Sequence, residues 1–184
     1  DRDIDFALAS PGDGTTIFSN LRDGTFKEME AASGLPANAL VFGLAVGDYN
    51  KDGWMDLVAT TWDGGLPRLF RNMMGDPAAG PNGRGGAFAL DATALADVPR
   101  QIAAPQFGVA FADFDNDGWL DIISVNGGDV GPALFVFRND GTGRFLDAGD
   151  LTGGDKIPAR GGRALAVADL DADGDLDFVI SNSG

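Results

Sequence analysis

Three stretches of nine residues carry acids at a spacing that could hold a metal ion: 48–56, 113–121 and 169–177. In the second stretch, Asp113, Asp115 and Asp117 occupy the first, third and fifth positions, a glycine follows, and an aspartate closes the stretch at position 121. Four acids in nine residues repel one another and weaken a fold unless a cation lies among them. Oxygen ligands at alternate positions before a glycine bend are typical of a loop around a hard divalent ion, and calcium fits best.

Each loop offers side-chain oxygens at positions 1, 3, 5 and 9 and a backbone carbonyl at position 7. Six or seven oxygens at about 2.3–2.6 Å satisfy calcium, whereas magnesium keeps more water and demands a stricter octahedron. The chain has no His and no Cys, which disfavours zinc, iron and copper. The predicted ligands are Asp48, Asn50, Asp52, the Trp54 carbonyl and Asp56; Asp113, Asp115, Asp117, the Trp119 carbonyl and Asp121; and Asp169, Asp171, Asp173, the Asp175 carbonyl and Asp177.

A fourth, incomplete copy opens the chain, with Asp1, the Asp3 carbonyl and Asp5 as its predicted ligands. Arg2 stands there where the other copies have glycine, which places a cation beside the loop. We therefore expect three calcium sites and a fourth, incomplete one. The alternative is a set of Asx turns with solvated acids and no ion. The tripled pattern in one strand context favours calcium in a structural role, clamping the turn between two strands.

Short apolar runs flank every loop. An alternating run precedes each loop, and a run rich in β-branched residues follows it; both have strand lengths and are too short for helices. A third run ending in Asn and a fourth opening with Gly-x-Phe complete each repeat. An EF-hand is excluded, because the twelfth position holds Ala59, Ser124 or Ile180 in place of an acidic ligand. An insertion at 73–85, rich in Gly, Pro and Ala, predicts a surface loop.

Four short strands per repeat, without helical periodicity, are typical of a propeller blade. The loops start 65 and then 56 residues apart, and about thirteen strands are expected. The predicted fold class is all-β, a single β-propeller segment over 1–184 with a stacked solenoid as the alternative. Its predicted parts are a partial blade 1–41, blades 42–106 and 107–162, and a partial blade 163–184. Closed propellers typically have four to eight blades, so we expect this to be part of a larger propeller, in which the remaining blades or another chain complete the ring.

The repeats resemble the FG-GAP/VCBS family, the calcium-binding blades of integrin α-subunit-type propellers and of many bacterial secreted proteins. The residues that carry the resemblance are Gly43 with the loop 48–56, Gly108 with the loop 113–121, and the loop 169–177. Segments 26–36 and 43–56 also resemble the propeller portion of ASPIC/UnbV-type proteins. The resemblance covers nearly the whole chain and implies a calcium-stabilised propeller outside the cell.

Composition narrows the function. A formal net charge of −15 argues against nucleic acid as a partner, and no apolar run is long enough to span a bilayer. We expect a non-catalytic binding, adhesion or assembly module that is secreted or at the cell surface, the bacterial periplasm included, with a protein or carbohydrate ligand. The alternative is the propeller portion of a secreted enzyme, for example a polysaccharide-degrading one, whose catalytic residues lie outside this chain.

Other recurring residues receive structural interpretations. Trp54 and Trp119 are expected to cover the loops and pack between blades, with sugar stacking as the alternative. Trp62 is a candidate for a binding surface. Three arginines that flank the third strand are expected to pair with nearby acids: Arg68, Arg71 and Arg138. Two phenylalanine positions recur once in each repeat and are expected in the core between blades: Phe18, Phe70 and Phe137 in the third run, and Phe26, Phe88 and Phe145 in the fourth.

Overall fold

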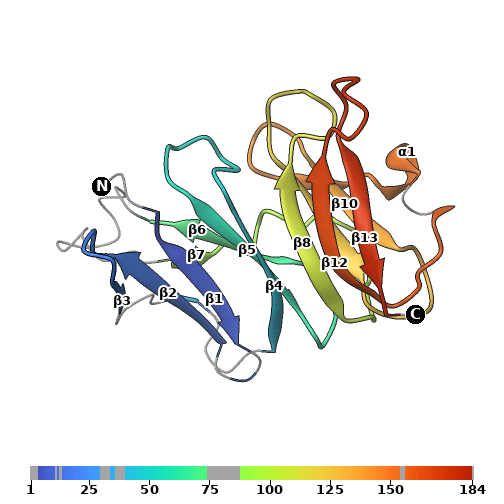
Figure 1. Ribbon diagram of the computed structural model, residues 1–184. Coiled ribbons are helices and arrows are strands. Elements are labelled where there is room, and N and C mark those ends of the chain that lie inside the picture. Colours follow the sequence, from blue (N-terminus) through green and yellow to red (C-terminus); the bar gives the residue numbers. More distant parts are fainter. Residues whose placement is uncertain are drawn as a thin grey trace.

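The computed structural model describes residues 4–10, 12, 14–29, 34–35, 40–73, 88–153 and 156–183. In these residues, thirteen strands form four antiparallel sheets that follow one another along the chain (Figure 1). The all-β fold class and its propeller-type blades are confirmed. The sheets form an open array and do not close into a ring. Except for Met73, the predicted insertion at 73–85 lies outside the described residues.

In the described residues, two of the sheets have four strands each, and neighbouring strands follow one another in the sequence. The first sheet has three strands and the last has two within the part of the chain that the structure describes. The first sheet contains β1 (Phe6–Ser10), β2 (Gly14–Asn20) and β3 (Phe26–Glu28). The second contains β4 (Val41–Gly47), β5 (Asp56–Thr61), β6 (Arg68–Asn72) and β7 (Phe88–Leu90). The third contains β8 (Gln106–Ala112), β9 (Asp121–Asn126), β10 (Leu134–Asn139) and β11 (Phe145–Asp147), and the fourth β12 (Gly162–Ala168) and β13 (Asp177–Asn182). A single helical turn, α1 (Gly149–Thr152), follows β11.

The second strands of the two complete sheets are buried along their whole length. Every residue of β5 and of β9 is buried, so neither strand shows the usual alternation of buried and exposed side chains. A strand with an apolar neighbour on both faces reads as a continuous apolar run, because successive side chains point to opposite faces and both are covered. The sheets therefore stack face to face around their central strands.

Each gap between neighbouring sheets holds its own apolar cluster. Within β9, Ile122 packs toward the second sheet, whereas Ile123 and its neighbour two residues on pack toward the fourth. In β10, Phe135 and Phe137 likewise pack toward the second sheet, and Leu134 and Val136 pack toward the fourth. The strand period of two thus divides one sheet's side chains between two interfaces. In the described residues, the blades are therefore held together by separate apolar clusters between neighbouring sheets.

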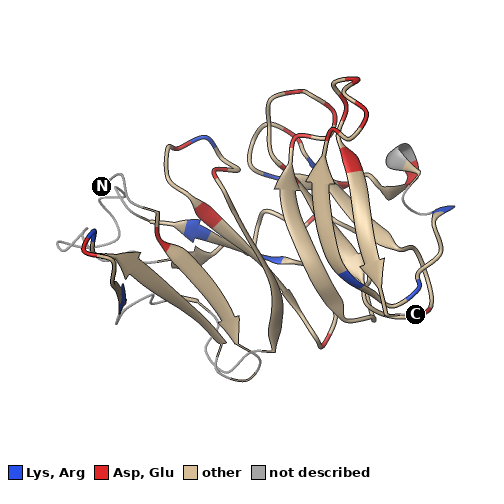
Figure 2. Ribbon diagram, viewed as in Figure 1, with Lys and Arg blue, Asp and Glu red and all other residues tan. Residues whose placement is uncertain are grey.

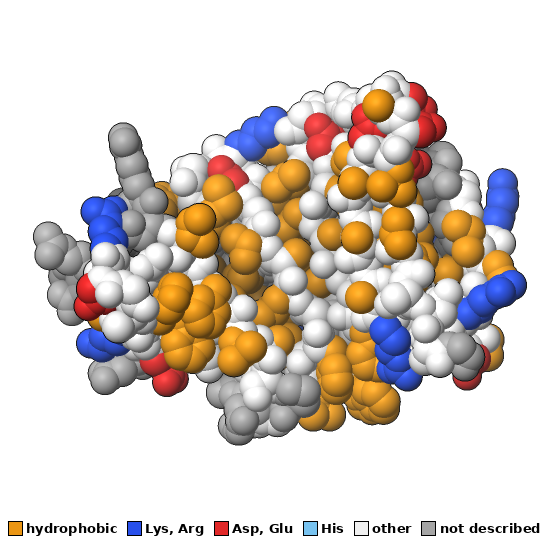
Figure 3. All heavy atoms as spheres, viewed as in Figure 1, with side chains coloured by type: hydrophobic (Ala, Val, Ile, Leu, Met, Phe, Trp, Pro, Cys, Tyr) orange, Lys and Arg blue, Asp and Glu red, His pale blue; other side chains and the backbone are white. Residues whose placement is uncertain are grey.

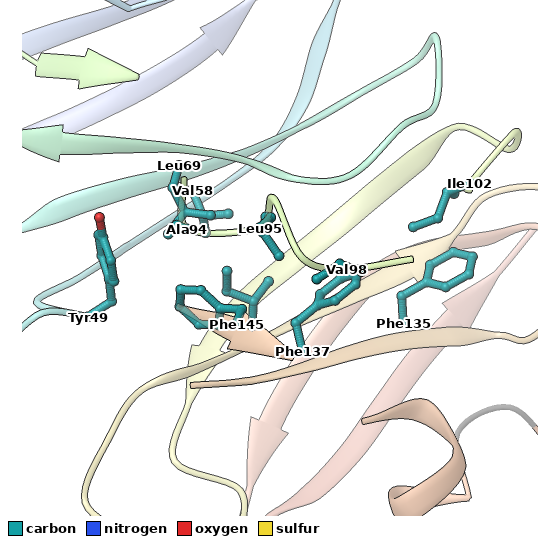
Figure 4. Close-up of a cluster of buried hydrophobic side chains, with 11 residues drawn as sticks. Tyr49, Val58, Leu69, Ala94, Leu95, Val98, Ile102, Phe135, Phe137 and Phe145 are labelled. Carbon is teal, nitrogen blue, oxygen red and sulfur yellow. The ribbon is translucent and has the colours of Figure 1, made fainter. Parts of the chain in front are cut away.

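A segment without regular structure fills the gap between the second and third sheets. Ala94, Leu95, Val98 and Ile102 come from the connection between β7 and β8, and all are buried. They pack against the aromatic rings of the third sheet, as Figure 4 shows for Phe137 and its neighbours. Twisted blades that radiate from one axis diverge toward the outside, so a segment of this kind is needed to fill the space.

The phenylalanines expected in the core differ between repeats. Phe137 and Phe145 are fully buried, and Phe70 and Phe88 are buried as well. Phe26 is an exception to that expectation, because its side chain is 49% exposed. Phe26 makes an edge contact with Phe6 at 4.9 Å, and Phe6 in turn stacks on Phe18. These rings form a small cluster on the first sheet, with no second sheet over Phe26 among the described residues.

Replacing Phe137 with Ala is expected to lower the free energy of unfolding by about 3–5 kcal/mol, because it opens a cavity in a fully buried cluster. Phe26→Ala is the matched control, and it should cost much less because its ring is half exposed. Urea unfolding followed by circular dichroism measures both. Equal losses for the two variants would contradict the inter-sheet packing described for Phe137.

Candidate metal centres

The three complete acidic loops lie at one end of the sheets. Each closes the hairpin between the first and second strand of its sheet: β4 to β5, β8 to β9 and β12 to β13 (Figure 1). Acidic residues gather at this end, in the loops that stand above the strands (Figure 2). In the space-filling view the acidic side chains are again most concentrated there, whereas apolar side chains cover much of the strands below (Figure 3).

The first aspartate of each loop holds the loop backbone in shape. One carboxylate oxygen of Asp113 accepts the amide of Asp117 at 3.0 Å, and the other accepts the amide of Gly118 at 2.9 Å. Asp48 and Asp169 make the same two bonds in their loops, at 2.9–3.0 Å and 3.1–3.2 Å. The glycine that receives this bond has positive φ in every loop, 87° to 98°. The predicted bend is therefore present three times.

Backbone amides also orient the third and fifth side chains. The third-position oxygen accepts the amide of the fifth residue at 3.0–3.3 Å in all three loops. The fifth-position oxygen accepts the amide of the seventh residue at 2.8–3.0 Å. Together these bonds orient the side chains at the first, third and fifth positions of each loop, although most of these acids stay exposed to solvent. The loops thus hold like charges close together, which costs free energy without a cation.

The structure brings some predicted ligands together more closely than others. Carboxylate oxygens of Asp113, Asp115 and Asp117 lie within 4.8 Å of one another, and so do those of Asp169, Asp171 and Asp177. These two groups could hold a metal ion. Asp121 and Asp173 belong to the same loops but fall outside the two groups. The predicted acids of the first loop, Asp48, Asp52 and Asp56, form no such group in the described residues. Asp1 and Asp3 of the incomplete copy lie outside the described residues, and the ligand roles of all three seventh-position carbonyls stay predictions.

Arginines from the third strand reach the first and second loops. Arg71 donates from Nε and Nη2 to one Asp52 oxygen, at 3.2 and 3.0 Å, and this bond raises the pKa of Arg71. Arg138 lies 3.7 Å from Asp115, and Arg68 lies 3.7 Å from Asp63. The predicted pairing of all three arginines with nearby acids is confirmed. In the first loop, Asp52 therefore already has a cationic partner.

The ninth aspartate is the buried member of the first and second loops. Asp56 and Asp121 are fully buried, and burial raises the pKa of Asp56 to about 7 and that of Asp121 to about 6. One Asp121 oxygen accepts the amide of Phe114 at 3.2 Å. In Asp56 the corresponding oxygen, Oδ2, is buried without a hydrogen-bond partner, one of three such side-chain oxygens in the described residues. A buried, unpartnered carboxylate oxygen beside other acids fits a cation ligand.

Comparison with known proteins agrees with this geometry. The sequence profile of the FG-GAP-like repeat matches residues 1–59 and 113–180, which is more than half of the chain. The chain belongs to the FG-GAP-like repeat family. The resemblance drawn from the loops is therefore confirmed.

Relatives of this FG-GAP chain carry the name cartilage acidic protein 1. The protein from Xenopus tropicalis is 33% identical over 175 residues, that from Homo sapiens 29% over 179 and that from Mus musculus 28% over 179. Each alignment covers 90% of this chain but 24% of the relative. The chain thus spans about a quarter of the length of these relatives. They are of the ASPIC/UnbV type, the narrower likeness noted in segments 26–36 and 43–56.

An asparagine at the end of the third strand completes the FG-GAP site, a role that the sequence alone did not assign. The backbone amide of Asn139 donates to Asp121 at 2.7 Å, and its side-chain amide donates to the Leu120 carbonyl at 3.1 Å. Asn72 repeats both bonds with Asp56 and Met55, at 2.7 and 3.0 Å. Asn20 makes the same two bonds, to Asp5 and to the carbonyl of Ile4. Ile4 and Asp5 are the described residues of the incomplete copy.

The recurrence of Asn at this position was visible in the sequence as the end of the Phe-x-Asn run. The hydrogen-bond partners of this Asn could not be read from the sequence, because they lie 15 to 19 residues away, where the acidic loop returns to the second strand. The third strand thus fixes the ninth aspartate and the carbonyl that precedes it, which sets where the loop returns to the sheet. Among the described residues, no helix is long and apolar enough to cross a membrane.

Asn139→Ala is expected to lower the free energy of unfolding by about 1–3 kcal/mol, because the carbonyl of Tyr49 in a buried bond and the carbonyl of Leu120 in a partly buried bond lose their donor. Asn20→Ala is the matched control at the same position of the first sheet. Its side-chain amide makes one longer bond, 3.3 Å to Ile4, in a more exposed setting, so the loss should be smaller. Thermal unfolding measures both. A loss for Asn20→Ala as large as that for Asn139→Ala would refute the importance given to the buried asparagine.

Proposed function

We propose that the three loops bind calcium and that calcium holds the blades of a non-catalytic, extracellular binding or assembly module. The observation that carries the proposal is the close approach of carboxylates within the second and third loops. In the first loop, the supporting observation is the buried Asp56 Oδ2, which has no hydrogen-bond partner. Oxygen-only ligands with a glycine bend are the donor set that calcium prefers. The recurrence of this arrangement in successive hairpins argues for a structural ion.

The residues that would hold calcium in the second loop are Asp113, Asp115, Asp117 and Asp121, with the carbonyl of Trp119. Bound calcium would supply the positive charge that offsets their repulsion. The protein residues do the rest: Asp113 fixes the loop backbone, and Asn139 ties Asp121 to the third strand. The loop is thereby tied to three strands of its sheet. The remaining loops would act in the same way, with Asn50 and the Arg71 bond weakening the first.

A non-catalytic role is supported by how the acids are used. The carboxylates at this end of the molecule are held by their own backbone amides, which suits a rigid scaffold better than acid–base chemistry. The chain lacks His and Cys, the common nucleophiles and proton carriers. We place the protein outside the cell because calcium there reaches millimolar levels, which fills even weak loops. The name of the relatives, cartilage acidic protein 1, fits this location and the acidity of the chain.

The partner is proposed to be a protein or a carbohydrate at the cell surface. The relatives extend well beyond the aligned region, so further blades that close the propeller belong to the same proposal.

Removing calcium with a chelator is expected to lower the melting temperature. Ligand binding at one hundred times its dissociation constant contributes about 2.7 kcal/mol per site, which in a domain of this size corresponds to about 5–10 °C. Differential scanning calorimetry with chelator, and with chelator plus excess calcium as the control, checks this. An unchanged melt after chelation would sink the structural role of calcium.

Replacing Asp113 and Asp117 together with Ala is expected to remove one bound calcium, because the loop loses two of its acids and the bonds that shape it. The matched control replaces Asp129 and Asp150, two exposed acids outside the loops, and keeps the same net charge change. Isothermal titration gives the number of ions per chain. Equal numbers for both variants would show that the second loop is not a calcium site.

A further inference from the structure

The fourth residue of each loop has an unusual backbone conformation. Lys51, Asn116 and Ala172 occupy this position, with φ of 56°, 56° and 63°. Left-handed φ is uncommon for residues other than glycine and costs free energy, so the surrounding loop must impose it. In the first two loops this conformation accompanies a side chain that reaches across to the next sheet.

Both of these side chains contact the same part of the next loop. The Lys51 ammonium lies 3.9 Å from the centre of the Trp119 ring, the seventh residue of the second loop. The Asn116 side-chain amide donates to the carboxylate of Asp175 at 3.3 Å and to the Gly174 carbonyl at 3.5 Å. Asp175 is the seventh residue of the third loop. Two different chemistries, a cation over a ring and an amide on oxygen, thus make the same link.

The link ends where the next loop is expected to supply its backbone ligand. The seventh residue offers the carbonyl predicted to bind calcium, and its own amide is already held by the fifth side chain. A contact on the side chain of the seventh residue therefore restrains two predicted ligands, the seventh carbonyl and the fifth carboxylate. A further bond crosses the same boundary, since the side-chain amide of Asn139 also donates to the carbonyl of Tyr49, the second residue of the first loop, at 2.9 Å.

We propose that the fourth residue of the first loop, Lys51, and that of the second loop, Asn116, set the calcium affinity of the loop that follows, so that neighbouring sites fill with positive cooperativity. The inference rests on the proposed calcium function. Closing the first loop around its ion fixes the backbone of Lys51 and places its ammonium over Trp119. The second loop then loses less conformational freedom when it binds. By linkage, occupancy of the second loop strengthens the first by the same factor.

The size of the effect follows from the contact. A cation–π contact at an exposed site is worth about 0.5–1 kcal/mol, which corresponds to a factor of about two to five in affinity. Repulsion between ions in neighbouring loops opposes this, but salt screens it at separations beyond the Debye length of about 8 Å. Lys51 is thus an affinity-determining residue for a site to which it contributes no ligand.

Terbium(III) luminescence tests the proposal site by site, because terbium takes calcium's oxygen ligands and Trp119 can excite an ion in the second loop. The background variant of the full chain is Trp54→Phe, which leaves Trp119 as the loop tryptophan, since the third loop has Asp175 at this position. Blocking the first loop with Asp48→Asn should raise the terbium midpoint of the second loop about two- to fivefold. The same block in a Lys51→Gln chain should leave the midpoint unchanged.

Lys27→Gln is the matched control, because it removes an exposed lysine from β3 and should leave the shift intact. Should Asp48→Asn disturb the circular dichroism spectrum, Asp52→Asn replaces it, because that change keeps the Asp48 bonds to the loop backbone. A midpoint shift that persists without Lys51, or no shift at all, overturns the proposal. Absence of Trp119-excited terbium emission in every variant overturns the calcium proposal and this inference with it.

Discussion

The structure depends on a buried aspartate at the start of the second strand in each complete sheet. Asp56 and Asp121 stand where the acidic loop, the second strand and the third strand meet, and both are fully buried. A carboxylate in this position is costly unless hydrogen bonds or a cation offset its burial. The backbone amides of Asn72 and Asn139 on the third strand offset part of this cost. Burial nevertheless keeps the pKa of both acids above the usual value for aspartate.

Two kinds of interaction hold the blades, and they act at different places. Apolar side chains alternate along the central strands and fill the gaps between sheets, so each blade is stabilised by its neighbours in turn. At the loop end the contacts are polar, from Lys51 to Trp119 and from Asn116 to Asp175. Each blade therefore contacts its neighbour twice, through apolar side chains of the strands and through polar side chains of the loops.

Much of this architecture could be predicted from the sequence, because the same pattern of residues occurs in several repeats and each copy supports the interpretation of the others. Hairpin turns, strand lengths and the bend at Gly118 are local features, and a pattern that recurs in three places is unlikely to arise by chance. The role of Asn139 could not be predicted, since its partners lie on another strand and in another blade. Nor could the burial of Leu95 and Val98, which have no strand or helix periodicity and are packed only because two sheets diverge around them.

The central claim is that the acids of the three loops are calcium ligands, and a crystal structure of the protein grown with calcium tests it most directly. The account predicts anomalous density in all three complete loops, within about 2.3–2.6 Å of the oxygens of Asp113, Asp115 and Asp117 in the second. Loops that keep the shape described here while holding only water at these positions would contradict it.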